Sequence, residues 1–281
     1  MTAANDTLIA QLRRDPLRHI TPLKMYALYS ESMRVLPVPT AHDDDHAGAL
    51  VLVAPTAVSQ YDSLNYGDVE WVVMPALPLH ADAALVAACA ATILNATQGL
   101  PFVLKTIDAA LVAALTANAG RSPPPQYRRA LCTFGAPGRP GTPGAPSAGV
   151  LKTAHVTDPA RALLRLHGVY SDAELDNLFA DGSARCHVRG DPAQPGAGGA
   201  IGVLLTFPNT PEIHEIGSLH VRADARRAGH ARALLGSALA DLHARQLKIR
   251  YVVDATNTAS IALAEAAGLQ LQLRLEHWVF A

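Results

Sequence analysis

The segment that most constrains the fold is a basic turn between a predicted strand and a predicted helix. The strand-like run spans Glu215–Val221, and the turn carries Arg226, Arg227 and Gly229. Because the first N–H groups of a helix have no partner within it, such a turn suits a phosphate-bearing ligand. The predicted helix has the one-face spacing of apolar residues, at Ala231, Leu234, Leu235, Ala238, Leu239 and Leu242.

The elements after this helix give the turn a wider context. A β-branched strand is predicted at Leu247–Asp254, a short helix between Asn257 and Gly268, and a final strand at Gln270–Phe280. Asn before a helix and Gly after it are common boundary residues. Together with the turn, this order resembles the acyl-CoA core of the GNAT acetyltransferases. Their (Gln/Arg)-x-x-Gly-x-(Gly/Ala) motif matches Arg226, Gly229 and Ala231.

The resemblance, together with a segment rich in Pro and Gly, predicts a linker and two domains. Residues 136–149 are rich in Pro and Gly, which is typical of a linker. Residues 150–281 follow the GNAT order of elements, with strands near 150–156, 184–189 and 200–207 and helices at 159–168 and 172–180. Ser171 and Glu174 form a capping-box pattern before the second of these helices.

Residues 1–135 repeat this order in a degenerate form. We expect helical structure across 7–34, strands at 48–54 and 69–74, a helix at 81–96, a strand at 102–106, a helix at 109–119 and a strand at 128–134. Pro75 and Pro78 stand where the second half has Arg226 and Gly229, so no CoA is expected to bind there. The predicted fold class is α/β: two GNAT-like halves, each with a mixed central sheet flanked by helices.

The composition of the chain indicates which cellular compartment and which kinds of binding partner to expect. The formal net charge of −1 gives no general argument for nucleic acid or an anionic membrane as a partner. The N-terminal segment lacks the apolar core of a signal peptide, and the run Ala83–Leu94 is too short to span a bilayer. The cysteines, Cys89, Cys132 and Cys186, are expected to be reduced and buried in a cytoplasmic protein. The run His42–His46 is interpreted as a hydrated acidic loop, so no metal site is predicted.

The resemblance implies where CoA lies. In the GNAT fold two neighbouring parallel strands, here within 216–221 and 250–254, separate to admit the pantetheine arm. The arm then lies against Leu219, His220 and Val221, and backbone N–H groups of that segment polarise the thioester carbonyl. The pyrophosphate lies at the turn, against Arg226, Arg227, Ala228, Gly229, His230 and Ala231. Asn257 and Ser260 face the arm as well, although Asn257 is also a good N-cap without any ligand.

The general base is predicted to be Glu215, whose position matches the glutamate base of the histone-acetylating GNAT proteins. In a regular strand Glu215 would share a face with Leu219 and Val221, and a β-bulge would change that relation. A solvated surface carboxylate is the alternative interpretation. His220 and His214 are rival bases, because imidazole titrates near neutrality.

The general acid has no clear candidate. Many GNAT proteins carry a tyrosine on the short helix, at the position of Ala264 in this chain. Tyr251 on the preceding strand could substitute, but an aromatic residue on a strand is more often part of the core. Water is a second source of the proton.

The predicted function is transfer of an acetyl group from acetyl-CoA to a small-molecule or peptide amine, by direct attack in a ternary complex. One alternative is a catalytically silent acyl-CoA-binding regulatory module, and another is a structural protein that binds no CoA. A homodimer is compatible with the sequence. No pattern in the sequence identifies the amine.

Overall fold

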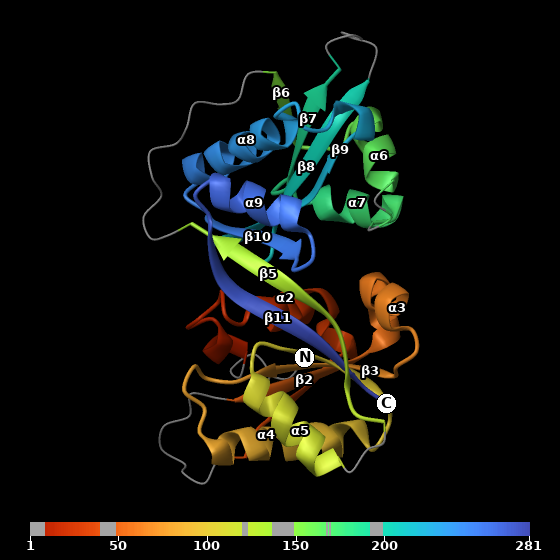
Figure 1. Ribbon diagram of the computed structural model, residues 1–281, viewed down its shortest axis with the longest axis vertical. Coiled ribbons are helices and arrows are strands. Elements are labelled where there is room, and N and C mark those ends of the chain that lie inside the picture. The colour runs from red at the N-terminus through yellow and green to blue at the C-terminus, as the bar shows by residue number, and fades with distance from the viewer. Residues whose placement is uncertain are drawn as a thin grey trace. The chain divides into compact units, whose positions relative to one another are not determined.

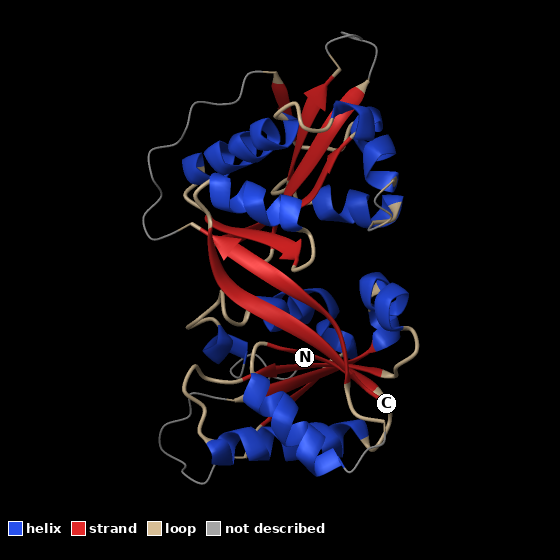
Figure 2. Ribbon diagram, in the orientation of Figure 1, coloured by secondary structure: helices blue, strands red, loops and turns tan. Residues whose placement is uncertain are grey.

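The described helices and strands fall into two α/β units, and in each unit helices lie on both faces of the strands (Figure 1, Figure 2). The computed structural model describes residues 9–39, 49–119, 123–136, 149–166, 168, 170–191 and 199–281. Unit 1 comprises Met1–Leu131 and Leu273–Ala281, and unit 2 comprises Cys132–Gln272. The predicted fold class, α/β with a mixed sheet flanked by helices, is confirmed.

In unit 1 the sheet follows the order β1-β2-β3-β4-β11. The strands are β1 (Arg34–Pro37), β2 (Leu50–Pro55), β3 (Trp71–Ala76), β4 (Phe102–Thr106) and β11 (Gln270–Phe280). Strands β3 and β4 are parallel, and the other pairs are antiparallel. Helices α2 (Ile20–Tyr29) and α3 (Gln60–Tyr66) cover one face, and α4 (Ala83–Thr97) and α5 (Ala109–Ala119) cover the other.

In unit 2 the sheet follows the order β5-β10-β9-β8-β7-β6. The strands are β5 (Gln126–Gly135), β6 (Val150–Thr153), β7 (Arg185–Gly190), β8 (Ala200–Pro208), β9 (Ile213–Val221) and β10 (Lys248–Asp254). Helices α6 (Asp158–Arg165) and α7 (Asp172–Phe179) pack on one face. Helices α8 (His230–Ala244) and α9 (Thr258–Ala266) pack on the other.

The order of elements predicted for the second half is confirmed, including the capping box of α7. There the Ser171 hydroxyl accepts from the backbone N–H of Glu174, and the Glu174 carboxylate accepts from the N–H of Ser171. Helix α6 begins one residue earlier than expected, with Thr157 as N-cap. Residues 137–148 of the predicted linker and the His42–His46 run lie outside the described residues.

The first half departs from expectation at two places. The helical pattern predicted across 7–34 is interrupted by turns around Pro16, which lacks a backbone N–H donor, and it ends before Arg34 starts β1. Helix α3 was not predicted, although its sequence carries a start signal. Ser59 is the N-cap, and its hydroxyl accepts from the N–H of Asp62.

The division between the units also differs from the expected domains 1–135 and 150–281. The final strand leaves unit 2 after Gln272, and its residues 276–280 pair antiparallel with β4 of unit 1. Conversely, Cys132 and Phe134 of β5 belong to the core of unit 2. The physical reason is strand pairing: alternation of apolar residues identifies a strand but does not say which neighbour it pairs with.

The three cysteines are free and buried, as predicted, and burial raises the pKa of the Cys89 and Cys186 thiols to about 12. None of the helices in the described ranges combines the length and the apolar character needed to cross a membrane.

Candidate functional site

The turn between β9 and α8 presents an unusual run of free backbone donors. Arg227 and Gly229 both have left-handed backbone, with φ of +63° and +79°, and Gly229 is the N-cap of α8. Within the part of the chain that the structure describes, no acceptor is found for the N–H groups of residues 227–232. Donors that converge in such a turn, at the positive end of a helix, form an anion-binding concavity.

The arginines of this turn differ in their surroundings. Arg222 is paired with Asp224 and with Asp191, at 2.6 and 3.1 Å. Arg226 is exposed, and its Nε donates to the carbonyl oxygen of Val221 at 3.1 Å, which ties the turn to the end of β9. No carboxylate partner is found for Arg226 or Arg227 among the described residues, so their charge remains available to an anion.

Next to the turn, the parallel strands β9 and β10 separate. Their pairing starts with Lys248 opposite Ile213 and ends with Tyr251 opposite Ile216. Beyond that pair, residues 217–221 of β9 keep only β8 as a paired neighbour among the described strands. Along these residues the edge of β9 that faces β10 therefore has no paired strand, as the addition of an extended ligand to a strand edge requires. Leu219, His220 and Val221, which the sequence predicts to contact CoA, lie in this part of the strand and are half-buried.

A β-bulge in β9 decides which side chains share a face. Val203 of β8 pairs with His220, but Leu205 pairs with Gly217, so β9 has an extra residue between these two pairs. Ser218, within the bulge, has φ of +53°. The bulge puts His220 on the same face as Glu215, and Leu219 and Val221 pack toward α8 and α9 instead. The alternative that the sequence left open is thus settled in favour of a bulge.

Glu215 lies in a polar cluster on the α6–α7 face of the sheet. Its Oε2 accepts from Arg250 Nη1 at 2.6 Å and from Asn209 Nδ2 at 2.8 Å. The Glu215 side chain is 12% exposed and that of Arg250 is 6% exposed. Burial and, secondly, the negative charge of Glu215 raise the pKa of the Tyr170 phenol, so this hydroxyl stays neutral.

Sequence reasoning missed Arg250, Asn209 and Tyr170. A signal existed for Arg250, because a cation inside the apolar run 249–253 needs a partner. The partner becomes identifiable only from the register, in which Arg250 lies opposite Glu215. No pattern in the sequence indicates Asn209 or Tyr170.

The rival base His214 lies on the opposite face of β9 from Glu215. Its side chain is buried, and burial lowers its pKa to about 4, with the nearby Arg245 as a second cause. His214 is therefore neutral at neutral pH but has little access to a ligand on the other face of the sheet. Of the two rival histidines, only His220 shares the face of Glu215.

Helix α9 and its N-cap carry the other two residues that the sequence predicts to contact CoA, Asn257 and Ser260. Asn257 is its N-cap, and its Oδ1 accepts from the N–H of Ser260 at 3.1 Å, so the structural interpretation of Asn257 is confirmed. Ala264 is fully buried and offers no proton. Tyr251 packs in the same hydrophobic cluster as Ala264. Burial raises the pKa of Tyr251, and a hydrogen bond with the Ser260 hydroxyl opposes this effect. The phenol of Tyr251 thus lies at the helix that carries Asn257 and Ser260.

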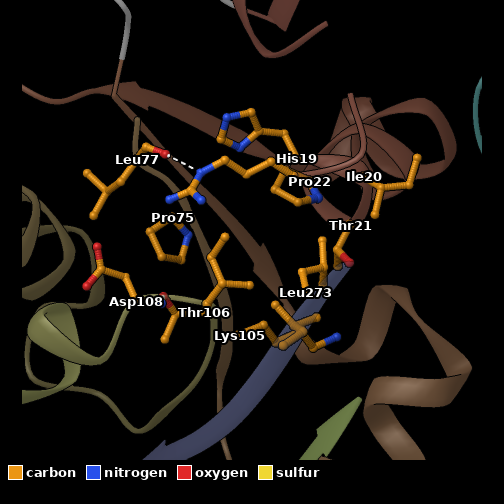
Figure 3. Close-up of a pocket in the computed structure, with 13 residues that line it drawn as sticks. His19, Ile20, Thr21, Pro22, Pro75, Leu77, Lys105, Thr106, Asp108 and Leu273 are labelled. Atoms are coloured by element: carbon orange, nitrogen blue, oxygen red, sulfur yellow. Dashed lines mark hydrogen bonds between the residues drawn. The ribbon is translucent and has the colours of Figure 1, made fainter. Parts of the chain in front are cut away.

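Unit 1 has a similar separation of parallel strands but no comparable turn. The pairing of β3 and β4 ends with Val73 opposite Leu104, and a pocket follows (Figure 3). Arg18 Nε donates to the carbonyl of Leu77 at 3.1 Å, so the segment before α2 covers this position. The carboxylate of Asp82 caps α4 by accepting from the N–H of Leu85 at 2.7 Å. A negative charge thus stands where a phosphate would have to bind.

We expect unit 2 to lose stability in mild acid, because it contains two buried histidines, His187 and His214. Burial lowers the pKa of His187 to about 4, as it does for His214. Unfolded histidine takes up a proton near pH 6.5, so between pH 6.5 and 4 the unfolded chain binds more protons. The contribution of these histidines to the free energy of unfolding is therefore fully present above pH 6.5 and is lost toward pH 4. Between pH 7 and 5 the free energy of unfolding should fall by about 2 kcal/mol per histidine.

Urea unfolding at pH 7 and pH 5 measures this change. His187→Gln is the matched variant: its stability should depend less on pH than that of the wild type, because one of the two groups is gone. Equal unfolding free energies at both pH values in the wild type would show that these histidines are hydrated or protonated in the folded state.

Comparison with known proteins finds a family model that matches part of unit 2. Residues 157–269 match the model of the acetyltransferase (GNAT) family. A GCN5-related N-acetyltransferase from Sphaerobacter thermophilus is similar in structure, with TM-score 0.53 and 18% identity, over 83% of this chain and 80% of that one. A Drosophila protein gives TM-score 0.58 and 15% identity, over 100% and 97%.

The two-unit arrangement also has a counterpart. A tandem GNAT protein from the clavulanic acid biosynthesis pathway aligns over 100% of this chain and 96% of its own, with TM-score 0.52 and 13% identity. At these identities the likeness shows the fold alone. No curated protein matches the sequence at a significant level.

Proposed function

Because residues 157–269 form a domain of the GNAT acetyltransferase family, we propose that the protein transfers an acetyl group from acetyl-CoA to an amine. The observation that carries this proposal is the run of N–H groups at residues 227–232 for which the described residues offer no acceptor, next to the unpaired edge of β9. The turn would hold the pyrophosphate of CoA, and the backbone of 219–221 would hold the pantetheine arm. Both features suit one extended, phosphate-bearing ligand.

The chemical obstacle is the proton on the acceptor. A lysine-type amine has a pKa near 10.4, so its deprotonation at pH 7 costs roughly 4–5 kcal/mol. Glu215 is the proposed base, directly or through a water molecule. Glu215 takes the proton that blocks the nitrogen lone pair, and the neutral amine then attacks the acetyl carbon. The N–C bond forms, the nitrogen loses its second proton to solvent, and the C–S bond breaks. The electron pair of that bond leaves on the CoA sulfur.

Two further groups complete the proposed reaction. Backbone N–H groups of the separated part of β9 would stabilise the negative charge that develops on the thioester oxygen. The thiolate would take its proton from water or from Tyr251, since Ala264 has none to give. The acceptor is proposed to be a small molecule or a peptide with a primary amine.

Ala264 favours a second candidate function, an acyl-CoA-binding module without turnover. The position that carries a tyrosine in many GNAT proteins holds a methyl group here. In this alternative the turn and the strand edge bind acyl-CoA as proposed, and the bound ligand controls a partner. Assays of binding and of turnover separate the two functions.

Calorimetric titration of acetyl-CoA tests the proposed binding, with an expected stoichiometry of one molecule per chain. Unit 1 should contribute no site, because Asp82 and the segment at Arg18 occupy the corresponding positions. Two molecules per chain would contradict our interpretation of unit 1. No binding at all would contradict the proposed function and favour a structural role.

A further inference from the structure

Ser218 has a backbone conformation that is unusual for a residue other than glycine. It lies within the bulge of β9 and has φ of +53°. A serine is held in this left-handed region only where the surrounding structure requires it. Bulges of this kind often lie beside functional sites, where they redirect side chains and backbone groups. The residues around Ser218 should therefore include a contact that keeps the bulge in place.

The bulge reverses the alternation of backbone groups along β9. Before the bulge, the carbonyl of Ile213 accepts from the N–H of Asn209 at 2.9 Å, so the odd-numbered residues of β9 bond toward β8. After the bulge, the N–H of Arg222 donates to the carbonyl of Ile201 at 2.9 Å, so the even-numbered residues do. The N–H of Val221 therefore points to the unpaired edge that faces β10, whereas a regular strand would bond it to β8.

The ring of Phe207 lies against the strand where this bulge begins. Phe207 pairs with Glu215 in the register, and Gly217 lies diagonally across from it. A Cβ placed on Gly217 would be 3.3 Å from Cε1 of the Phe207 ring, so the ring packs directly on the glycine backbone. Phe207 is 1% exposed, and the ring of Tyr170 meets it edge-on, with 6.4 Å between the centroids. Aromatic rings packed on cross-strand glycines stabilise the pairing of strands.

We propose that Phe207 and Gly217 are positioning residues: the ring holds the backbone of Gly217, and this contact keeps the bulge at Ser218. The inference rests on the proposed acyl transfer. Through the bulge, the two residues set which N–H groups of β9 meet the thioester and which side chains share the face of Glu215. Neither residue supplies a group that reacts, and both act through the backbone of β9.

Two replacements of Ser218 test the role of the bulge. Ser218→Val puts a β-branched side chain on left-handed backbone, so the bulge should be lost and kcat at saturating acetyl-CoA should fall about ten- to hundredfold. Ser218→Gly permits this backbone and should retain most of the activity. Gln246→Val is the matched control, because Gln246 has φ of +57° but is exposed and follows α8. Its kcat should equal that of the wild type.

A double-mutant cycle tests the contact between Phe207 and Gly217, and it also serves if Ser218→Val fails to fold. Gly217→Ala alone crowds the ring and should lower kcat severalfold. In a Phe207→Leu background the ring is gone, so the same change should cost much less. Phe102→Leu, which replaces a buried phenylalanine of unit 1, is the control for lost packing and should leave kcat unchanged. Losses that multiply in the double variant would overturn the inference.

Cross-strand NOEs report the bulge without any turnover. In the wild type Val203 lies opposite His220, whereas without a bulge it would lie opposite Leu219. The NOE from Val203 should therefore move to Leu219 in Ser218→Val and stay with His220 in Ser218→Gly. In Phe207→Leu the NOE between Val203 and His220 should weaken.

The outcomes distinguish the inference from the proposed function. Full activity in a variant whose NOEs show the changed register, or lost activity in Ser218→Val with the register unchanged, would overturn the inference. If the wild type binds acetyl-CoA but acetylates no amine, the proposed function fails instead. The NOE comparison then still tests whether the ring holds the bulge, and an unchanged NOE in Phe207→Leu would refute it.

Discussion

Replacing Glu215 with Gln is expected to lower the rate of acetyl transfer by about 10²–10⁴-fold, with the affinity for acetyl-CoA nearly unchanged. Gln keeps the shape of the side chain and still presents an oxygen to Arg250 and Asn209, so the local fold is preserved. What it loses is the ability to take a proton. The loss should shrink as pH rises, because more of the amine is then already neutral.

Steady-state kinetics at pH 7 and pH 9, with calorimetry of acetyl-CoA binding, measure these effects. A Glu215→Gln protein with full activity at neutral pH would show that the base lies elsewhere. His220 would then be the first candidate, because the bulge at Ser218 puts it on the same face of β9 as Glu215. His214 would remain a poor candidate, being buried on the other face.

Gly229→Val is expected to weaken acetyl-CoA binding by about 100-fold or more. The residue has φ of +79°, which a β-branched side chain adopts only with strain on the order of 1–3 kcal/mol. The variant either distorts the turn, which misdirects the free N–H groups, or keeps it and puts a bulky side chain where phosphate oxygens approach. Either result removes the anion site at the start of α8.

Gly99→Val is the matched control for this prediction. Gly99 has φ of +80°. A Cβ added to either Gly99 or Gly229 would meet no atom within 4 Å. The two variants therefore carry the same backbone strain, but only Gly229 lies at the turn. Calorimetry should show normal binding in Gly99→Val and greatly weakened binding in Gly229→Val. Unchanged affinity in a folded Gly229→Val protein would refute the assignment of the turn.

Local sequence patterns predicted most of unit 2 because its elements carry their own signals. The periodicity of α8, the cap at Asn257 and the stop at Gly268 each depend on a few consecutive residues. The turn before α8 was predicted for the same reason, since Arg226 and Gly229 lie three residues apart on one turn. Helix α3 was missed even though Ser59 and Asp62 carry a start signal, because its seven residues show little periodicity.

Features that depend on pairing between strands could not be predicted. The position of the bulge at Ser218 follows from how β9 pairs with β8, and the Arg250–Glu215 contact from how it pairs with β10. The return of the final strand to unit 1 likewise depends on its pairing with β4. A sequence pattern fixes the faces of one strand, whereas these properties belong to two strands at once.

The most direct test of the central claim is a turnover measurement with the purified protein, acetyl-CoA and a panel of primary amines. Mass spectrometry would quantify the acetylated amine while a thiol reagent quantifies free CoA. We predict that both products form in equal amounts with at least one amine, and much more slowly with Glu215→Gln. Tight binding of acetyl-CoA with neither product above the rate without protein would contradict the claim and identify the chain as an acyl-CoA-binding module.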